Sequence, residues 1–127
     1  MLSHKYRFHG HGSLRYVYRN GQTARNRFLS VRYVANKHRL HSRVAVVVGK
    51  KTVKSAVKRN RIRRRVFEVI RTHWDHLSPN TDMVVTVFSA ELLTMSHEEL
   101  EGIVLDVFKQ GHLYKTVKTS DTIEGEL

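Results

Sequence analysis

Residues 43–70 read RVAVVVGKKTVKSAVKRNRIRRRVFEVI, in which one hydrophobic pattern gives way to another. The run RVAVVVGKK (43–51) is rich in β-branched residues, which favours a strand. It is apolar on both faces up to Gly49, a pattern typical of a strand in the centre of a sheet. From about Ser55 the apolar residues follow a helical period. The sequence therefore predicts a buried strand followed by a long helix.

The predicted helix extends from about Ser55 to about His76, and its apolar and cationic residues separate. At 100° per residue, one sector holds Ile62, Val66, Val69, Ile70 and Leu77. The opposite side holds Lys58, Arg61, Arg64, Arg65 and Arg71. Arg59 and Arg63 lie toward the apolar sector. We therefore expect the first two turns to project past the core, with cations exposed on several sides.

Further helices and strands are predicted before and after this strand–helix unit. LRYVYRN (14–20) predicts a short helix ended by Gly21, with Leu14, Val17 and Tyr18 on one face. RFLSVRYVA (27–35) and DMVVTVF (82–88) predict strands. A capping box, Ser96 with Glu99, opens a last helix. The apolar face of that helix comprises Leu100, Ile103, Val104, Val107 and Phe108.

These elements predict one α+β domain over residues 1–127, with helices packed on a single sheet. The expected order is α-β-β-(β)-α-β-α, in which the strand in parentheses is optional. Residues 5–115 are expected to be ordered. The ends, 1–4 and 116–127, are expected to be flexible because they are short and polar.

Charge is divided unevenly along the 127 residues, whose net charge is +12 and whose pI is about 10.5. Residues 1–67 hold 19 Lys and Arg and no acid, whereas residues 68–127 carry a net −7. A solvated helix face usually mixes signs, because opposite charges three and four apart stabilise a helix. KRNRIRRR (58–65) therefore indicates a phosphate-binding surface. The alternatives are a solvated face and a nuclear-localisation patch, which is usually disordered.

The sequence disfavours cysteine-based sites, metal sites, and a membrane or secreted location. The absence of cysteine excludes disulfides, zinc–thiolate sites and thiol catalysis. No apolar run has the length of a membrane span, and the N-terminus lacks a signal-peptide core, so we expect a cytoplasmic protein with no membrane partner. The pairs His9–His11 and His73–His76 lack a third metal ligand. A protein-only nuclease using Glu68 and His73 is an alternative, but the two lie about 140° apart on one helix.

The stretch RNRIRR (59–64) resembles the RNR signature of the bacterial ribonuclease P protein subunit. The strand that ends in paired lysines before it is similar to the family's corresponding strand. SLRYVYRNG (13–21) and SHEELEGIVLDVF (96–108) resemble the family's first and last helices. The resemblance covers about residues 5–115, with the segments in the family's order and spacing.

This resemblance implies an α/β sandwich with a left-handed βαβ crossover, and a protein that is not itself the catalyst. In the family, the RNA subunit holds the Mg²⁺ ions, and cleavage removes the 5′ leader from precursor tRNA. We therefore expect no catalytic residue, no metal site and no obligate protein partner in this chain. The alternative is a ribosomal or general RNA-binding protein with no role in processing.

The resemblance also implies two sets of contacts. Contacts with the catalytic RNA are expected at Lys50, Lys51, Lys58, Arg59, Asn60, Arg61, Arg63, Arg64 and Arg65. A cleft between the first helix and the sheet would hold the single-stranded leader, with contacts at Leu14, Tyr18, Phe28, Arg32 and Tyr114. Leu14 and Arg32 stand where the family usually has aromatic residues, so Arg32 could stack or contact phosphate.

The strand that lines this cleft has two faces. Phe28, Ser30, Arg32 and Val34 are expected on one, and Leu29, Val31 and Tyr33 on the other. Phe28 and Tyr33 could equally pack in the core.

Overall fold

A strand, a helix and a second strand form the centre of the computed structural model, which describes residues 11–36 and 41–115. Strand β3 (Arg43–Val48) leads through helix α2 (Ala56–Thr72) to strand β4 (Thr81–Val87), and β3 and β4 pair in parallel. The remaining elements are α1 (His11–Asn20), β1 (Gln22–Arg25), β2 (Leu29–Ala35), two short 3₁₀ turns η2 (Trp74–His76) and η3 (Ala90–Leu93), and α3 (His97–Gln110). This confirms the α+β order, including the optional strand. The residues expected to be flexible, 1–4 and 116–127, lie outside the described ranges.

The sheet has the strand order β1-β2-β4-β3, so β4 and not β3 is the inner partner of the parallel pair. The prediction that β3 is central is wrong, because β3 lies at an edge of the sheet. Its residues are apolar on both faces because helices cover both faces. Val44, Val46 and Val48 pack in the main core, whereas Ala45 is buried in a smaller core beneath α1.

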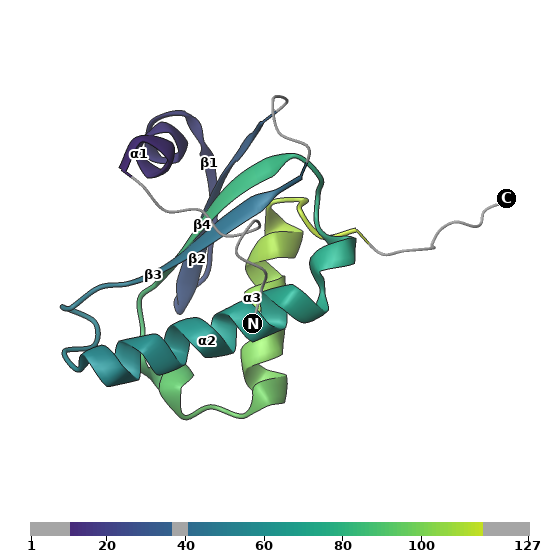
Figure 1. Cartoon of the computed structure of the whole chain (residues 1–127). Coiled ribbons are helices and arrows are strands. Elements are labelled where there is room, and N and C mark those ends of the chain that lie inside the picture. Colours follow the sequence, from purple (N-terminus) through teal and green to yellow (C-terminus); the bar gives the residue numbers. More distant parts are fainter. Residues whose placement is uncertain (1–10, 37–40, 116–127) are drawn as a thin grey trace, which may run out of the picture.

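Helix α1 packs on one face of the sheet, and α2 and α3 pack on the other (Figure 1). The main core lies on the α2 and α3 side and includes the predicted apolar sector of α2, with Ile62, Val66, Val69 and Ile70 all buried. The smaller core consists of Val17, Ala45 and Val84. Two layers of helix around one sheet thus leave the opposite side of α2 facing solvent.

Helix α2 begins where the sequence predicts. The Ser55 side chain accepts a hydrogen bond from the Lys58 N–H at 3.3 Å, the usual N-cap contact. The helix ends at Thr72, four residues before the predicted end, and His73 is its C-cap. His73 Nε2 lies 2.6 Å from Glu101 Oε2 of α3, a tertiary contact at the point where the helix ends. Leu77 is buried as predicted, but it lies beyond the helix.

Gly21 joins α1 to the sheet at a position that admits no side chain. A Cβ there would lie 2.6 Å from the Val17 carbonyl oxygen and 2.9 Å from the Tyr33 carbonyl oxygen. The glycine therefore allows the end of α1 to sit directly against β2. Helix α1 begins at His11, three residues earlier than predicted.

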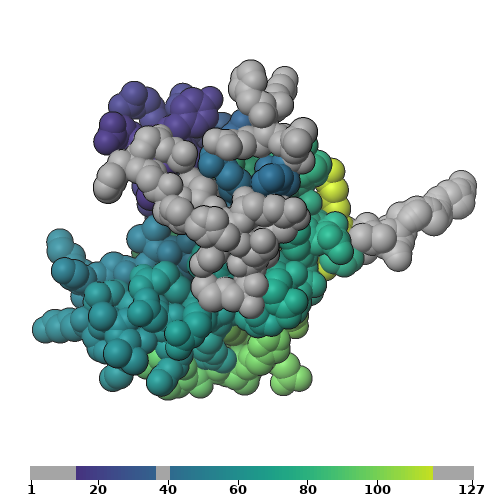
Figure 2. Space-filling model, in the orientation of Figure 1, coloured from purple at the N-terminus to yellow at the C-terminus, as the bar shows by residue number. Residues whose placement is uncertain are grey.

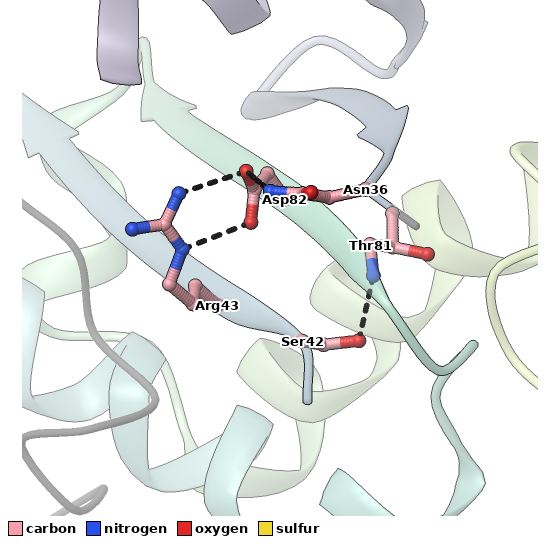
Figure 3. A network of polar contacts seen from close by, with 5 residues as sticks. All are labelled: Asn36, Ser42, Arg43, Thr81 and Asp82. Atoms are coloured by element: carbon pink, nitrogen blue, oxygen red, sulfur yellow. Dashed lines mark hydrogen bonds and ion pairs between the residues drawn. The ribbon is translucent and has the colours of Figure 1, made fainter. Parts of the chain in front are cut away.

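A buried carboxylate fastens β3 to β4 (Figure 3). Asp82 is 2% exposed and accepts hydrogen bonds from Arg43 Nε at 3.1 Å, Arg43 Nη2 at 2.9 Å and Asn36 Nδ2 at 2.8 Å. Beside it, Ser42 Oγ accepts from the Thr81 N–H at 3.0 Å. These contacts fix the start of both strands and hold them in register.

None of the helices in residues 11–36 and 41–115 is long and apolar enough to cross a membrane.

Candidate nucleic-acid interface

The solvent side of α2 carries cations with no acid among them in the first turn. Lys58, Arg61 and Arg64 are exposed, and Arg61 and Arg64 lie roughly opposite the buried sector that contains Ile62 and Val66. Lys58 lies one turn before Ile62 and only about 40° from it around the helix, so the prediction that it lies opposite this sector is wrong. Because the apolar sector faces the sheet, Arg61 and Arg64 point away from it, and Lys58 lies at its exposed flank. They form a cationic stripe along the first half of the helix.

The turn before α2 extends this stripe. Lys50, Lys51 and Lys54 are exposed, and the turn is closed by N–H groups of Thr52 and Val53 that donate to the Gly49 carbonyl, each at 3.1 Å. In the space-filling view, the surface of this turn and of the first turns of α2 stands out from the body at the left (Figure 2). We call the set Lys50, Lys51, Lys54, Lys58, Arg61 and Arg64 the α2 basic surface.

Arg59 and Arg63 lie closer to the body of the protein. Arg59 Nη1 donates to the carbonyls of Val53 and Lys54 at 2.9 and 2.8 Å, which ties the helix to the preceding turn. The expectation of exposed cations on several sides is therefore wrong for Arg59, which is only partly exposed. Arg63 donates to the side-chain oxygen of the exposed Asn60.

Arg65 does not face away from the protein, so the prediction that places it opposite the apolar sector is wrong. Its Nη1 donates to the Leu92 carbonyl and its Nη2 to the Met95 carbonyl, both at 2.6 Å. Arg65 is partly buried. The segment that follows β4 packs against this side of α2, and the guanidinium satisfies two of its carbonyls. The geometry gives Arg65 a structural role.

A pocket of about 370 Å³ lies where α2 meets the start of α3, lined by Arg61, Arg64, Arg65, Glu68 and His97. Its one carboxylate, Glu68, is bound to Arg71, with Nη2 2.5 Å from Oε2. That hydrogen bond lowers the pKa of Glu68, so the carboxylate stays ionised and paired. The pocket therefore presents mainly guanidinium groups to an incoming ligand, which suits an anion.

A second surface lies where α1 meets the sheet. Val17 is fully buried and Leu14 packs against the same small core, so Leu14 is not free to stack on a base. Tyr18 is 45% exposed. Arg32 lies beneath the helix, with Nε donating to the Val17 carbonyl at 3.3 Å and Nη1 donating to Thr23 Oγ1 at 2.7 Å. Tyr18 and Arg32 thus lie on the α1 side of the sheet, as predicted.

Phe28 and Tyr114 lie elsewhere. Phe28 precedes β2, packs against the main core and has the Arg27 guanidinium 4.2 Å from its ring centroid. Tyr114 also packs against the main core, and its ring stacks on His76 with the centroids 5.4 Å apart. The structure therefore does not bring these two rings together with Tyr18, and core packing is the role it shows for Phe28.

A family model described as Ribonuclease P matches residues 2–111. The chain belongs to the ribonuclease P protein family.

Individual members of the family are also similar to this chain in sequence and structure. The ribonuclease P protein component of a Synechococcus species is 29% identical over 125 residues, covering 96% of this chain and 93% of the relative. That of Lactobacillus delbrueckii subsp. bulgaricus is 32% identical over 80 residues, and the match spans 63% of this chain and 66% of the relative's length. The structure of the Staphylococcus aureus RNase P protein superposes with a TM-score of 0.77 at 25% identity, covering 87% of this chain and 98% of that one.

His73 and His76 of this ribonuclease P family member take part in tertiary contacts. His73 contacts Glu101, and His76 stacks on Tyr114. No group of three His, Asp or Glu side chains able to hold a metal ion occurs in residues 11–36 and 41–115. His73 and Glu68 each have another partner, so they do not form the acid–base pair that a protein-only nuclease needs. His9 lies outside the described residues.

One pair of residues on the α1 side of the sheet, Phe88 and Arg25, was not predicted from the sequence and lies outside the family's RNR signature. Phe88 is 41% exposed, and the Arg25 guanidinium carbon lies 5.1 Å from its ring centroid. The alternation of Val84, Thr86 and Phe88 along the predicted strand (82–88) was a usable signal, because it places all three on one face. Arg25 offered no signal, since it lies in the short polar strand β1.

Proposed function

We propose that this chain is the protein subunit of ribonuclease P, and that it assists a catalytic RNA in removing the 5′ leader from precursor tRNA. The family membership supports the ribonucleoprotein context. The observation that carries the proposal is the separation of two surfaces suited to RNA. The α2 basic surface lies on a helix that packs on one face of the sheet, whereas Tyr18 and Arg32 lie on the opposite face, beside α1.

In this proposal, the α2 basic surface binds the catalytic RNA. Arg61 and Arg64 have no acid within one helical turn on the N-terminal side, and Glu68, one turn after Arg64, is paired with Arg71, so the two arginines are available to phosphates. The planar fork of arginine can contact two phosphate oxygens at once, and each neutralised phosphate releases counterions. The positive end of the α2 dipole adds to this field. Lys50, Lys51 and Lys58 act as further point charges, while Asn60 holds Arg63.

The leader, in turn, lies between α1 and the sheet. Single strands bind to basic grooves with aromatic faces that stack on bases. Tyr18 supplies an exposed ring, and Arg32 supplies a guanidinium at the floor. Leu14 is committed to the small core, so Tyr18 carries the stacking from α1.

Magnesium belongs to the RNA and the substrate in this proposal. The described residues do not fit a dedicated protein site, because no three potential ligands converge. The chain's contribution to chemistry is then positional. It holds the catalytic RNA through α2 and the leader through the cleft, and so places the cleavage site.

The experiment combines purified protein, a ribonuclease P RNA and end-labelled precursor tRNA at low magnesium. A single cut at the 5′ end of the mature tRNA, dependent on both components, is the expected result. Binding to the RNA with no increase in cleavage would favour the rival, an RNA-binding protein with no role in processing. Cleavage by nuclease-treated protein alone would contradict the assignment of catalysis to the RNA.

A further inference from the structure

An exposed aromatic ring lies just after β4, on the α1 side of the sheet. Val84 of β4 is fully buried beneath α1, Thr86 is partly buried, and Phe88, which follows the last residue of the strand, is 41% exposed. The Phe88 N–H donates to the Phe28 carbonyl at 2.8 Å and so continues the pairing with the neighbouring chain, which leaves these three alternate residues on the same side. The increase in exposure along the strand indicates that α1 covers only the first part of this face.

Arg25 lies on the same open part of the face. Its register partner on β2 is Ser30, and the register partner of Ser30 on β4 is Thr86, so the three residues form a row across the sheet. The guanidinium carbon of Arg25 lies 5.1 Å from the Phe88 ring centroid, within the range of a cation–π contact. An exposed ring held beneath a guanidinium offers both a stacking face and a charge for phosphate.

Cations border this end of the sheet. Val48 of β3 is in register with Val87 of β4, so the turn with Lys50 and Lys51 begins beside Phe88. The nearest acid in the following segment, Glu91, lies 3.8 Å from Arg27 and is therefore paired with a cation of its own. An excess of positive charge around the ring favours a nucleic-acid strand over an acidic or apolar surface of a protein.

We propose that Phe88 and Arg25 form a second stacking subsite for single-stranded RNA, continuous with the cleft at Tyr18. This inference rests on the proposed function, because the RNA that reaches the subsite is the leader. The four steps from Val84, which packs beneath α1, to Phe88 span about 13 Å of extended chain. With stacked bases about 3.4 Å apart, that length corresponds to about four nucleotides.

The test uses holoenzyme assembled from the full chain and a ribonuclease P RNA, under conditions that block cleavage. Its probes are precursor tRNAs that share one mature body and carry leaders lengthened one nucleotide at a time. Wild type is compared with Phe88→Ala, Phe88→Trp and Arg25→Gln. Tyr16→Ala is the matched control, because Tyr16 is an aromatic residue that is 56% exposed on α1.

Phe88→Ala is expected to weaken binding at least about fivefold, but only for leaders that reach the subsite. Tyr18→Ala should also weaken binding of precursor tRNA, but the loss should begin at a different leader length. Phe88→Trp should bind like wild type, Arg25→Gln should follow Phe88→Ala with a smaller loss, and Tyr16→Ala should change nothing. Since Phe88 and Arg25 are exposed, the melting temperatures of these variants should match wild type.

The outcomes separate the two proposals. If wild type gains affinity with leader length and Phe88→Ala and Arg25→Gln match it at every length, the subsite is overturned and the proposed function stands. An equal loss by Phe88→Ala on mature tRNA, which has no leader, would also overturn the subsite. If wild type itself does not distinguish precursor from mature tRNA, both proposals fail.

Discussion

Arg64 and Arg65 are adjacent on α2, yet their guanidinium groups have different environments. Arg64 is exposed in the basic surface, whereas Arg65 donates to the carbonyls of Leu92 and Met95. Replacing Arg65 with Gln removes the charged donor from both carbonyls. We expect Arg65→Gln to lower the free energy of unfolding by about 1–3 kcal/mol. Urea denaturation measures this, with Arg64→Gln as the matched control.

The Arg64 variant should unfold at the wild-type urea concentration. Equal stability of the two variants would show that the hydrogen bonds of Arg65 contribute nothing to the fold. It would also return Arg65 to the set of residues available to RNA.

Asp82 gives a larger expected effect, because its ion pair with Arg43 is nearly inaccessible to water. The Arg43 and Asp82 side chains are 13% and 3% exposed. Asp82→Ala leaves a buried guanidinium without its counter-charge and should cost about 3–5 kcal/mol of stability. Chemical denaturation measures this loss. Glu68→Ala, which breaks an exposed pair with Arg71, should change stability little. A small loss for Asp82→Ala would mean that water or another residue replaces the carboxylate.

At the scale of elements, the start and buried face of α2 could be predicted from the sequence because both are local. Ser55 caps the helix through its own backbone neighbours, and the apolar period defines one sector. The end at Thr72 could not be predicted, because the contact at this point, from His73 to Glu101, comes from another helix. The same limit explains β3, whose two-sided burial comes from helices and not from flanking strands.

Strand β1 and the environments of individual cations also could not be predicted from the sequence. QTAR has four residues, of which only Ala24 is buried, so no period is visible. In the candidate site, residue types and the side of the helix could be read from the sequence, which sufficed for Arg61 and Arg64. Nothing in the local pattern indicated that Arg65 binds carbonyls of a segment about 30 residues away. The placement of Phe28 and Tyr114 depended on tertiary packing in the same way.

Glu101 of α3 contacts His73 at the end of α2, and this contact should make the stability of the protein depend on pH. The hydrogen bond with His73 lowers the pKa of Glu101 below its ordinary value of 4.5. A carboxylate with a lowered pKa in the folded state stabilises the protein above its ordinary pKa, and this stabilisation is lost as the pH falls through the lowered value. Wild type should therefore exceed Glu101→Gln in stability at neutral pH, and the difference should shrink below about pH 4.

Thermal unfolding across that pH range measures the difference between the two proteins. A difference that stayed constant down to the most acidic pH would contradict an ionised Glu101 as its source.

For the whole molecule, the concentration of cations on one surface predicts a response to anions. Repulsion among these cations is unrelieved in the free protein, and a ligand that binds only the folded state raises its stability by mass action. Millimolar pyrophosphate should therefore raise the melting temperature. The double variant Arg61→Gln/Arg64→Gln should show a smaller rise, with an unchanged melting temperature in the absence of ligand.

Lys109→Gln is the control for this response, because Lys109 is an exposed cation in the last turn of α3, outside the α2 basic surface. It should keep the wild-type rise. An equal reduction in both variants would point to a general effect of net charge and not to the α2 basic surface.

In the proposed function, one fold presents two independent RNA surfaces, and measuring both in the same holoenzyme tests this independence. Arg61→Ala/Arg64→Ala should weaken assembly with the catalytic RNA and reduce the salt slope of log K by roughly 0.7–0.9 for each phosphate that the variant no longer neutralises. Tyr18→Ala should assemble normally and bind mature tRNA normally, but its affinity for precursor tRNA should fall by roughly 1–3 kcal/mol. If both variants weaken assembly to the same extent, the two surfaces are not independent and the proposed division of RNA binding between them is contradicted.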